Sequence, residues 1–184
     1  MSSSRSLNVG GEKKFRPTII ALAKQSAFAR IRVLGVVRDC EENGKAVFES
    51  ILDSLKGIGV PQPAERGEAT GAEMRAFVEL LPPGRTTGCL ETLFVEAAEN
   101  VDPVRCHRIM TDCLRNVRTS AGFTQARFDK IAALALLSSQ RSKYYTRVGE
   151  ALQSDDFRDV LNAEPMRPLF RIVERLRKLS EEAS

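Results

Sequence analysis

The feature that most constrains the fold is one unbroken, largely aliphatic run, Ile31–Arg38, which ends at the acidic residues Asp39 and Glu41. A run of this length and β-branched content, followed by a helix, predicts a buried strand of an α/β sheet. Ligand and catalytic groups of open α/β sheets gather at the carboxyl ends of such strands. Two carboxylates there are a candidate Mg²⁺ site, because this cation takes oxygen ligands and usually needs only one or two carboxylates.

The patterns around this run predict alternating strands and helices. A helix is expected over 13–28 after a strand end at 7–9, and Val47, Phe48, Ile51, Leu52 and Leu55 have the helical period. The polar segment 62–71 predicts a surface loop. The alternation over 73–81 predicts a less deeply buried strand.

From Gly88 onward the sequence predicts only helices. One begins near Gly88, and the pair Asp102-Pro103 supplies an N-cap and first residue for the next, which runs to about Val117. Further helices are expected over 124–139, 149–161 and 166–179. The predicted architecture is a single α/β domain over residues 7–184, with a small, mostly parallel sheet flanked by helices. Within it, residues 7–100 form the α/β core, residues 101–184 form a helical extension, and residues 1–6 are a disordered tail.

Composition narrows the class of protein only slightly. The 184 residues carry a net charge of +4, which permits contact with phosphate but is equally explained by solubility. Cysteines 40, 89, 106 and 113 contain no C-x-x-C pair, which predicts reduced, buried thiols in a cytoplasmic protein. No apolar segment approaches the length of a membrane span, so no membrane partner is expected.

The acidic residues have a second interpretation as helix caps. Asp39 could cap the helix that follows it, with Glu42 completing a capping box, and Glu41 would then favour the positive end of that helix. Glu91 sits in the first turn of another predicted helix, where the same explanation holds. The spacing alone leaves both roles open, metal ligand and cap.

Several blocks of the sequence together resemble a Toprim-like family of small prokaryotic proteins, which is related to the nuclease domain of the OLD (overcoming lysogenization defect) proteins. No single block is very specific, but their order and spacing are, and they cover nearly all of the chain from about Leu7. The blocks are Gly10–Phe15, Leu34–Glu41, Ala46–Ile51, Phe77–Pro82, the G-x-L-E-x-L segment Gly88–Leu93, Lys130–Ala132 and Val148–Ala151.

The resemblance implies a Toprim-like, Rossmann-like fold and Mg²⁺-dependent chemistry on the phosphodiesters of DNA or RNA. The family's D-x-D pair matches Asp39 and Glu41, and its further acidic residue matches Glu91, so these three are the expected metal ligands. No residue of this chain matches the family's first-strand glutamate, which would serve as a general acid or base. That difference keeps a rival hypothesis open, a non-catalytic relative that binds a protein or nucleic acid. A sheet without that first strand also leaves an edge that a homodimer or partner chain would cover.

Two other groups of residues are candidates for function. The segment 140–147 combines the cations Arg141, Lys143 and Arg147 with two tyrosines, as nucleic-acid-binding surfaces do, although a plain exposed loop explains it as well. His107 is the single histidine, and Cys106 beside it on a helix would face a different direction, so the two make a poor nucleophile and base.

Overall fold

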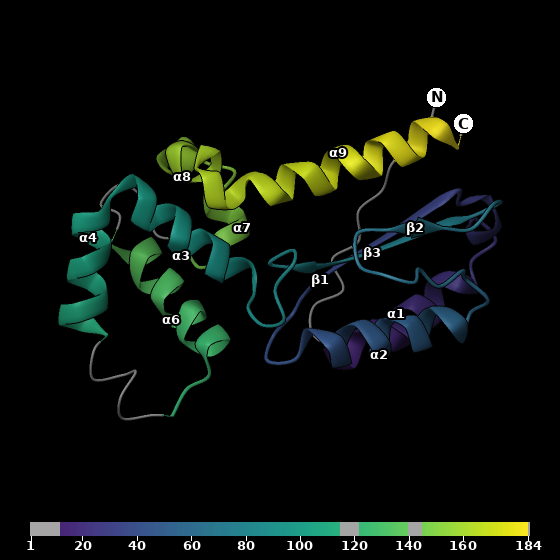
Figure 1. Cartoon of the computed structure of the whole chain (residues 1–184), viewed down its shortest axis with the longest axis horizontal. Coiled ribbons are helices and arrows are strands. Elements are labelled where there is room, and N and C mark those ends of the chain that lie inside the picture. The colour runs from purple at the N-terminus through teal and green to yellow at the C-terminus, as the bar shows by residue number, and fades with distance from the viewer. Residues whose placement is uncertain (1–11, 115–121, 140–144, 184) are drawn as a thin grey trace. The chain divides into compact units, whose positions relative to one another are not determined.

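The fold combines a small sheet with many helices (Figure 1). The structure is a computed structural model that describes residues 12–114, 122–139 and 145–183. Its strands are β1 (Val33–Asp39), β2 (Ala69–Thr70) and β3 (Arg75–Leu81). Its α-helices are α1 (Glu12–Ala23), α2 (Gly44–Lys56), α3 (Leu90–Val101), α4 (Pro103–Arg108), α6 (Gln125–Ser138), α7 (Val148–Ala151), α8 (Arg158–Asn162) and α9 (Arg167–Glu182). A π-helical turn, η2 (Ile109–Cys113), follows α4, and a 3₁₀ turn, η3 (Asp155–Phe157), precedes α8.

The chain forms two compact units, each assembled from segments that are far apart in the sequence. Unit 1 takes Met1–Val37, Lys45–Leu80 and Ile172–Ser184, and unit 2 takes Arg38–Gly44 and Leu81–Arg171. The end of β1 therefore belongs with the helices of unit 2. The expectation of a single domain, with an α/β core over residues 7–100 and a helical extension over residues 101–184, stays a prediction.

The sheet contains three strands in the order β1-β3-β2. Strands β2 and β3 are antiparallel, with Ala69 opposite Phe77. The Arg75 amide donates to the carbonyl of Arg32, and the Cys40 amide donates to the carbonyl of Leu81, so β1 and β3 run in the same direction. The α/β class is confirmed, but the sheet is mixed rather than mostly parallel, and β2 lies in a segment predicted to be a loop.

The predicted order of strand burial is wrong. All residues of β3 from Ala76 to Leu81 are buried, whereas in β1 only Val36 is buried and Val37 is 40% exposed. The reason is topological, because β3 lies between the other two strands and β1 pairs only with β3 among the described strands. An aliphatic run identifies a strand, but it does not say which strand takes the middle of the sheet.

In unit 1, helices lie on both faces of the sheet. Figure 1 shows α1 and α2 on one side and α9 on the other. Ile51 and Leu55 of α2 have no exposed surface, as their helical spacing predicts. A Cβ added to Gly35 in β1 would lie 2.6 Å from Leu176 Cδ2, so the bare backbone lets α9 approach the strand closely.

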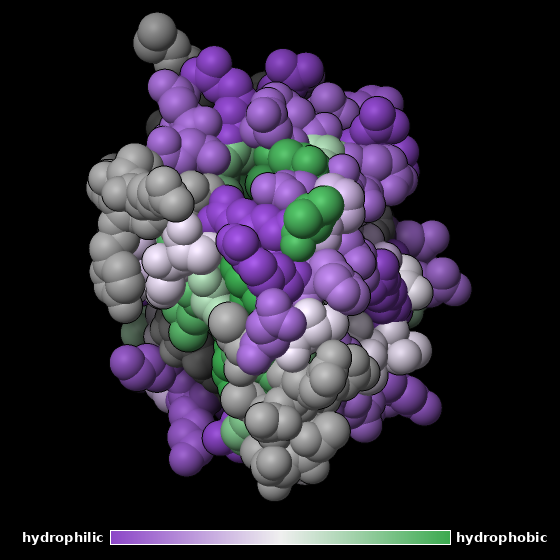
Figure 2. Space-filling view, turned by 90° about the vertical axis from the view of Figure 1, so that its left-hand side faces the viewer, coloured by the Kyte–Doolittle hydropathy of each residue, from purple (hydrophilic) through white to green (hydrophobic). Residues whose placement is uncertain are grey.

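Unit 2 is built around α3, which packs against α4, α6 and α8. Phe94 of α3 is fully buried, and its ring centroid lies 5.5 Å from that of Phe157. The Asp102 side chain accepts a hydrogen bond from the Arg105 amide at 3.0 Å and Pro103 opens α4, which confirms the predicted cap. Figure 2 views the side of the molecule on which α4 and α6 lie, where hydrophilic residues dominate and apolar side chains are exposed in small separate areas.

The predicted burial of the cysteines is confirmed for the thiols that the structure describes. Cys40, Cys89 and Cys106 are free and buried, and the side chain of Cys113 lies outside the described residues. Over residues 12–114, 122–139 and 145–183, no helix has both the length and the apolar character that crossing a membrane requires.

Candidate functional site

Asp39 ends β1 and caps a helix far away in the sequence. Its Oδ1 accepts a hydrogen bond of 2.9 Å from the amide of Leu90, the first residue of α3. The predicted capping box with Glu42 is wrong, because the next helix, α2, does not begin until Gly44. The carboxylate nevertheless stabilises the positive end of a helix dipole, which is that of α3.

Glu41 is held by backbone contacts on both sides. Its amide donates to the carbonyl of Gly88 and its carbonyl accepts from the amide of Gly88, both at 2.8 Å. Between the two acidic residues, Cys40 is fully buried, and its Sγ lies 3.3 Å from the carbonyl of Arg85. Hydrogen bonds thus join the segment 40–44 to the segment 81–88. They hold in place the backbone at the end of β1, which carries both carboxylates.

The backbone of Glu41 is in the left-handed region, with φ of 52°. Residues other than glycine rarely adopt this conformation, and they do so at a cost where the surrounding structure enforces it. Such residues concentrate at functional sites. The conformation of Glu41 therefore supports a role for its side chain beyond simple solvation.

The Glu41 side chain binds a lysine that sequence reasoning gave no role. Lys130 Nζ of α6 lies 2.9 Å from both carboxylate oxygens of Glu41. Burial lowers the pKa of Lys130, but the hydrogen bonds and charge of Glu41 outweigh it, so that the pKa is raised overall. The two residues are 89 positions apart in the sequence, so no local pattern could predict the pair.

The third predicted ligand, Glu91, joins the same neighbourhood from the first turn of α3. The pKa of Asp39 rises from 3.8 to about 6, chiefly because the carboxylate is desolvated, and the Leu90 hydrogen bond opposes that rise. The charges of Glu91 and Glu41 raise this pKa further, while Lys130 lowers it. The structure thus brings Glu41 and Glu91 close enough to Asp39 to oppose its ionisation, and Lys130 close enough to favour it.

The carboxylates are not arranged as a finished multi-ligand metal site. Within the described ranges, no group of three or more His, Cys, Asp or Glu side chains is placed to hold a metal ion. An Mg²⁺ ion bound mainly by water needs only one or two carboxylates, so the donor set of Asp39, Glu41 and Glu91 still suits this cation. Lys130 would have to leave Glu41 for that residue to take part.

The candidate nucleic-acid segment is described only in part. Arg141 and Lys143 lie outside the described residues, and Arg147 is exposed directly before α7. Tyr145 is 3% exposed, and its hydroxyl group lies 2.7 Å from Asp156 Oδ2. Its ring also packs edge-on against Phe157, so Tyr145 is a core residue rather than a surface for stacking bases.

Cys106 is unsuited to be a nucleophile. Its thiol is buried, and desolvation, followed by the charges of Asp102 and Glu99, raises its pKa to about 11. The thiolate that would attack a substrate is therefore disfavoured. His107, in contrast, is exposed to solvent.

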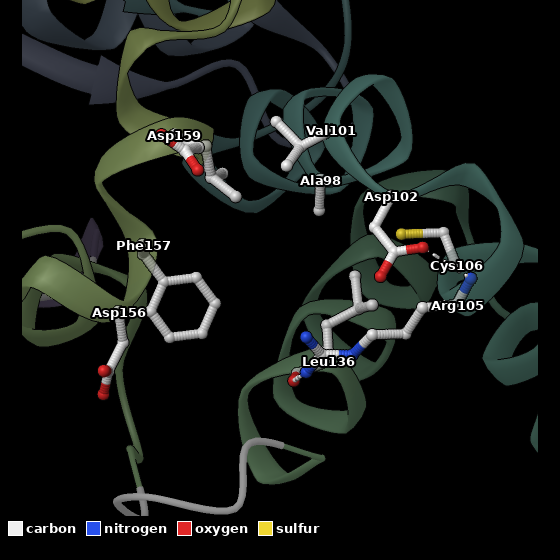
Figure 3. A pocket seen from close by; sticks show the side chains of 10 residues that line it. Ala98, Val101, Asp102, Arg105, Cys106, Leu136, Asp156, Phe157 and Asp159 are labelled. Carbon is white, nitrogen blue, oxygen red and sulfur yellow. Dashed lines mark hydrogen bonds between the residues drawn. The ribbon is translucent and has the colours of Figure 1, made fainter.

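A small pocket in unit 2 is separate from the carboxylates (Figure 3). Its volume is about 130 Å³, and its lining includes the Phe157 ring, Leu136 and four charged residues. The four are Asp102, Arg105, Asp156 and Asp159. Three of these already have partners, since Arg105 binds Ser139 and the carbonyl of Leu136, Asp102 caps α4, and Asp156 binds Tyr145. The pocket contains none of the predicted ligands.

Comparison with known proteins identifies the family of the chain but no characterised relative. One protein family matches residues 7–167. No curated protein and no solved structure matches the chain. Because the family match covers most of the sequence, the chain belongs to the family described as "Protein of unknown function (DUF3226)".

Proposed function

We propose that the chain is a Toprim-like, Mg²⁺-dependent protein that acts on the phosphodiesters of nucleic acids. Asp39, Glu41 and Glu91 would hold the metal ion, and Lys130 would contact the substrate phosphate. The observation that carries the proposal is the meeting of these four charged groups at the end of β1 and the start of α3. The order of sequence blocks that resemble the Toprim-like family supports the same assignment.

The electrostatics of the site favour a bound cation. Asp39 is partly desolvated beside two other carboxylates, and it holds a single hydrogen bond among the described residues. The hydrogen bond from Leu90 uses Oδ1, so Oδ2 is the atom that would accept a metal or a metal-bound water. A carboxylate whose pKa is raised by burial and by neighbouring charges, as that of Asp39 is, is typical of sites that bind or transform a ligand.

Lys130 is suited to bind a phosphate in such a site. Its ammonium group already bridges both oxygens of a carboxylate, and phosphate oxygens are equivalent acceptors. A metal ion at Glu41 would replace the charge of Lys130 and free the ammonium group for the substrate. The ion itself would supply charge stabilisation at phosphate and a more acidic bound water.

A second candidate function is a non-catalytic binding protein. The bidentate pair of Glu41 with Lys130 supports it, because an internal cation can neutralise this carboxylate without any metal. In that case Lys130 would stay on Glu41 permanently, and the other two carboxylates would only stabilise α3.

Cleavage assays on labelled DNA and RNA with Mg²⁺ or Mn²⁺ separate the two functions. The wild type is expected to cleave at least one substrate, and Lys130→Met is expected to lose about 100-fold in rate, since it removes a charged group facing the transition state. Glu91→Gln should lower the rate as well. The matched control, Glu49→Gln, changes an exposed carboxylate of α2 that pairs with Lys45 and should keep full activity.

Two results would oppose the enzyme. Absence of cleavage by the wild type with every substrate and both metals would favour the binding protein. Cleavage that Lys130→Met and Glu91→Gln leave unchanged would place the reaction elsewhere in the chain.

A further inference from the structure

One face of α6 and the residue just before its cap form a partly exposed surface. Arg127, Lys130 and Leu134 follow at spacings of three and four, which places them on one side of the helix. Phe123 precedes the cap and joins them through its contact with Arg127. Arg127 is exposed and Leu134 is 47% exposed. The opposite side is packed into unit 2 through Ala126, Ala133 and Leu137 among others. We call these four residues, of which Phe123 and Lys130 are partly exposed, the α6 face.

The α6 face begins with an aromatic ring paired to a cation. The guanidinium carbon of Arg127 lies 4.3 Å from the centroid of the Phe123 ring. This contact brings two flat groups together at the start of the helix, since a cation is attracted to the face of a ring. Flat aromatic rings and guanidinium planes are the groups on which unpaired bases stack.

The α6 face carries two cations. Asp129 is the single carboxylate of α6, and it is 3% exposed, with its oxygens held by Thr92 and Gln125. The exposed charges of this helix are therefore Arg127 and Lys130. The helix itself adds no exposed carboxylate, but Lys130 is paired with Glu41 of the neighbouring segment.

The α6 face leads directly to the candidate metal site. Lys130 lies one turn after Arg127, so their Cβ atoms are about 5–6 Å apart. The ammonium group of Lys130 contacts Glu41, so the start of the α6 face lies near the carboxylates. A strand that stacks on Phe123 and Arg127 would thus have its backbone beside the proposed metal.

We propose that the α6 face binds single-stranded nucleic acid and sets a preference for unpaired substrates at the neighbouring site. The assignment rests on the proposed function for its use in cleavage, but binding itself does not depend on it. Phe123 and Arg127 would stack on a base, and Arg127 and Lys130 would contact the backbone phosphates. A duplex hides its base faces, so it would gain only the phosphate contacts.

Fluorescence anisotropy in EDTA tests binding without any cleavage. Short labelled single strands of DNA and of RNA are compared with the matching duplexes at one salt concentration, and the tighter single strand identifies the preferred sugar. The wild type is expected to prefer single strands. Phe123→Leu, which keeps apolar bulk but loses the flat ring, should weaken that binding about tenfold.

Arg127→Ala is a second test that does not depend on the ring. It is expected to weaken binding by a similar factor, because it removes both a stacking plane and a phosphate contact. The matched control is Arg158→Ala, which removes an exposed arginine of the same unit outside the α6 face and should bind like the wild type. Melting temperatures of all variants establish that they are folded.

The results distinguish this inference from the proposed function. Equal affinity for single strands and duplexes, or wild-type affinity in both Phe123→Leu and Arg127→Ala, would overturn the inference. If single strands bind through the α6 face but no metal supports cleavage, the enzyme proposal fails and the binding surface stands. If duplexes are cleaved with no dependence on Phe123, the enzyme stands and the inference fails.

Discussion

Asp39→Asn is expected to raise the free energy of unfolding at neutral pH by about 1–3 kcal/mol. The pKa of Asp39 rises from 3.8 to about 6 in the folded protein, chiefly through desolvation, so the ionised carboxylate destabilises the fold. Asparagine carries no charge, and its carbonyl oxygen can still accept the hydrogen bond from the Leu90 amide. The substitution therefore removes the unfavourable charge while keeping the cap of α3.

The same substitution should change how stability depends on pH. Between pH 3.8 and about 6 the folded wild type binds more protons at Asp39 than the unfolded chain does. Its stability contribution is therefore complete below pH 3.8 and is lost as the pH rises through 6. Asp39→Asn should lack this part of the decline.

Urea denaturation across this pH range measures both effects. Asp53→Asn, at an exposed position of α2, is the matched control and should follow the wild type. A variant Asp39→Asn that is less stable than the wild type at neutral pH would contradict the account, because it would mean that the charge is needed for folding. Asp39 is expected to make the protein less stable than asparagine would at the same position. Such a loss of stability is typical of a residue that is kept for ligand binding.

Gly88→Ala is expected to destabilise the protein by about 2–4 kcal/mol. Gly88 has φ of 118°, a conformation that side chains other than hydrogen rarely allow. A Cβ there would lie 2.7 Å from Pro82 Cδ and 3.2 Å from Thr92 Oγ1. Relief of these contacts would pull Gly88 away from Glu41, to which it makes two backbone hydrogen bonds, so metal binding should weaken as well.

Gly84→Ala is a matched control for the backbone effect. Gly84 also has a positive φ, of 75°, but no atom lies within 4 Å of its added Cβ. Gly84→Ala should therefore lower the free energy of unfolding by only about 1 kcal/mol, because it adds backbone strain without a clash. Equal losses of stability in the two variants, measured by urea denaturation, would show that the contact of Gly88 with Pro82 is unimportant.

Local patterns predicted most of the helices. The helical spacing around Ile51 and Leu55 and the Asp102-Pro103 cap both depend on residues within one or two turns, and both agree with α2 and α4. The predicted helix over 124–139 likewise corresponds to α6. Short-range periodicity is sufficient for such elements because the buried face of a helix repeats along its own sequence.

The errors concern features that depend on distant segments. The middle position of β3 follows from pairing with both other strands, and no residue of β1 or β3 encodes it locally. Asp39 caps a helix 51 residues away, and Glu41 binds a lysine 89 residues away. The sequence could name the acidic residues, but it could not show which helix and which cation meet them.

The central claim is that the carboxylates at the end of β1 bind a divalent cation, and isothermal titration with Mg²⁺ at neutral pH tests it most directly. We predict that the wild type and the control Glu49→Gln bind Mg²⁺ alike, and that Asp39→Asn and Glu91→Gln lose at least about tenfold in affinity. Lys130→Met should bind the ion more tightly, because it removes the ammonium group that competes for Glu41. No heat of binding from the wild type, or equal binding by Asp39→Asn, would contradict the account.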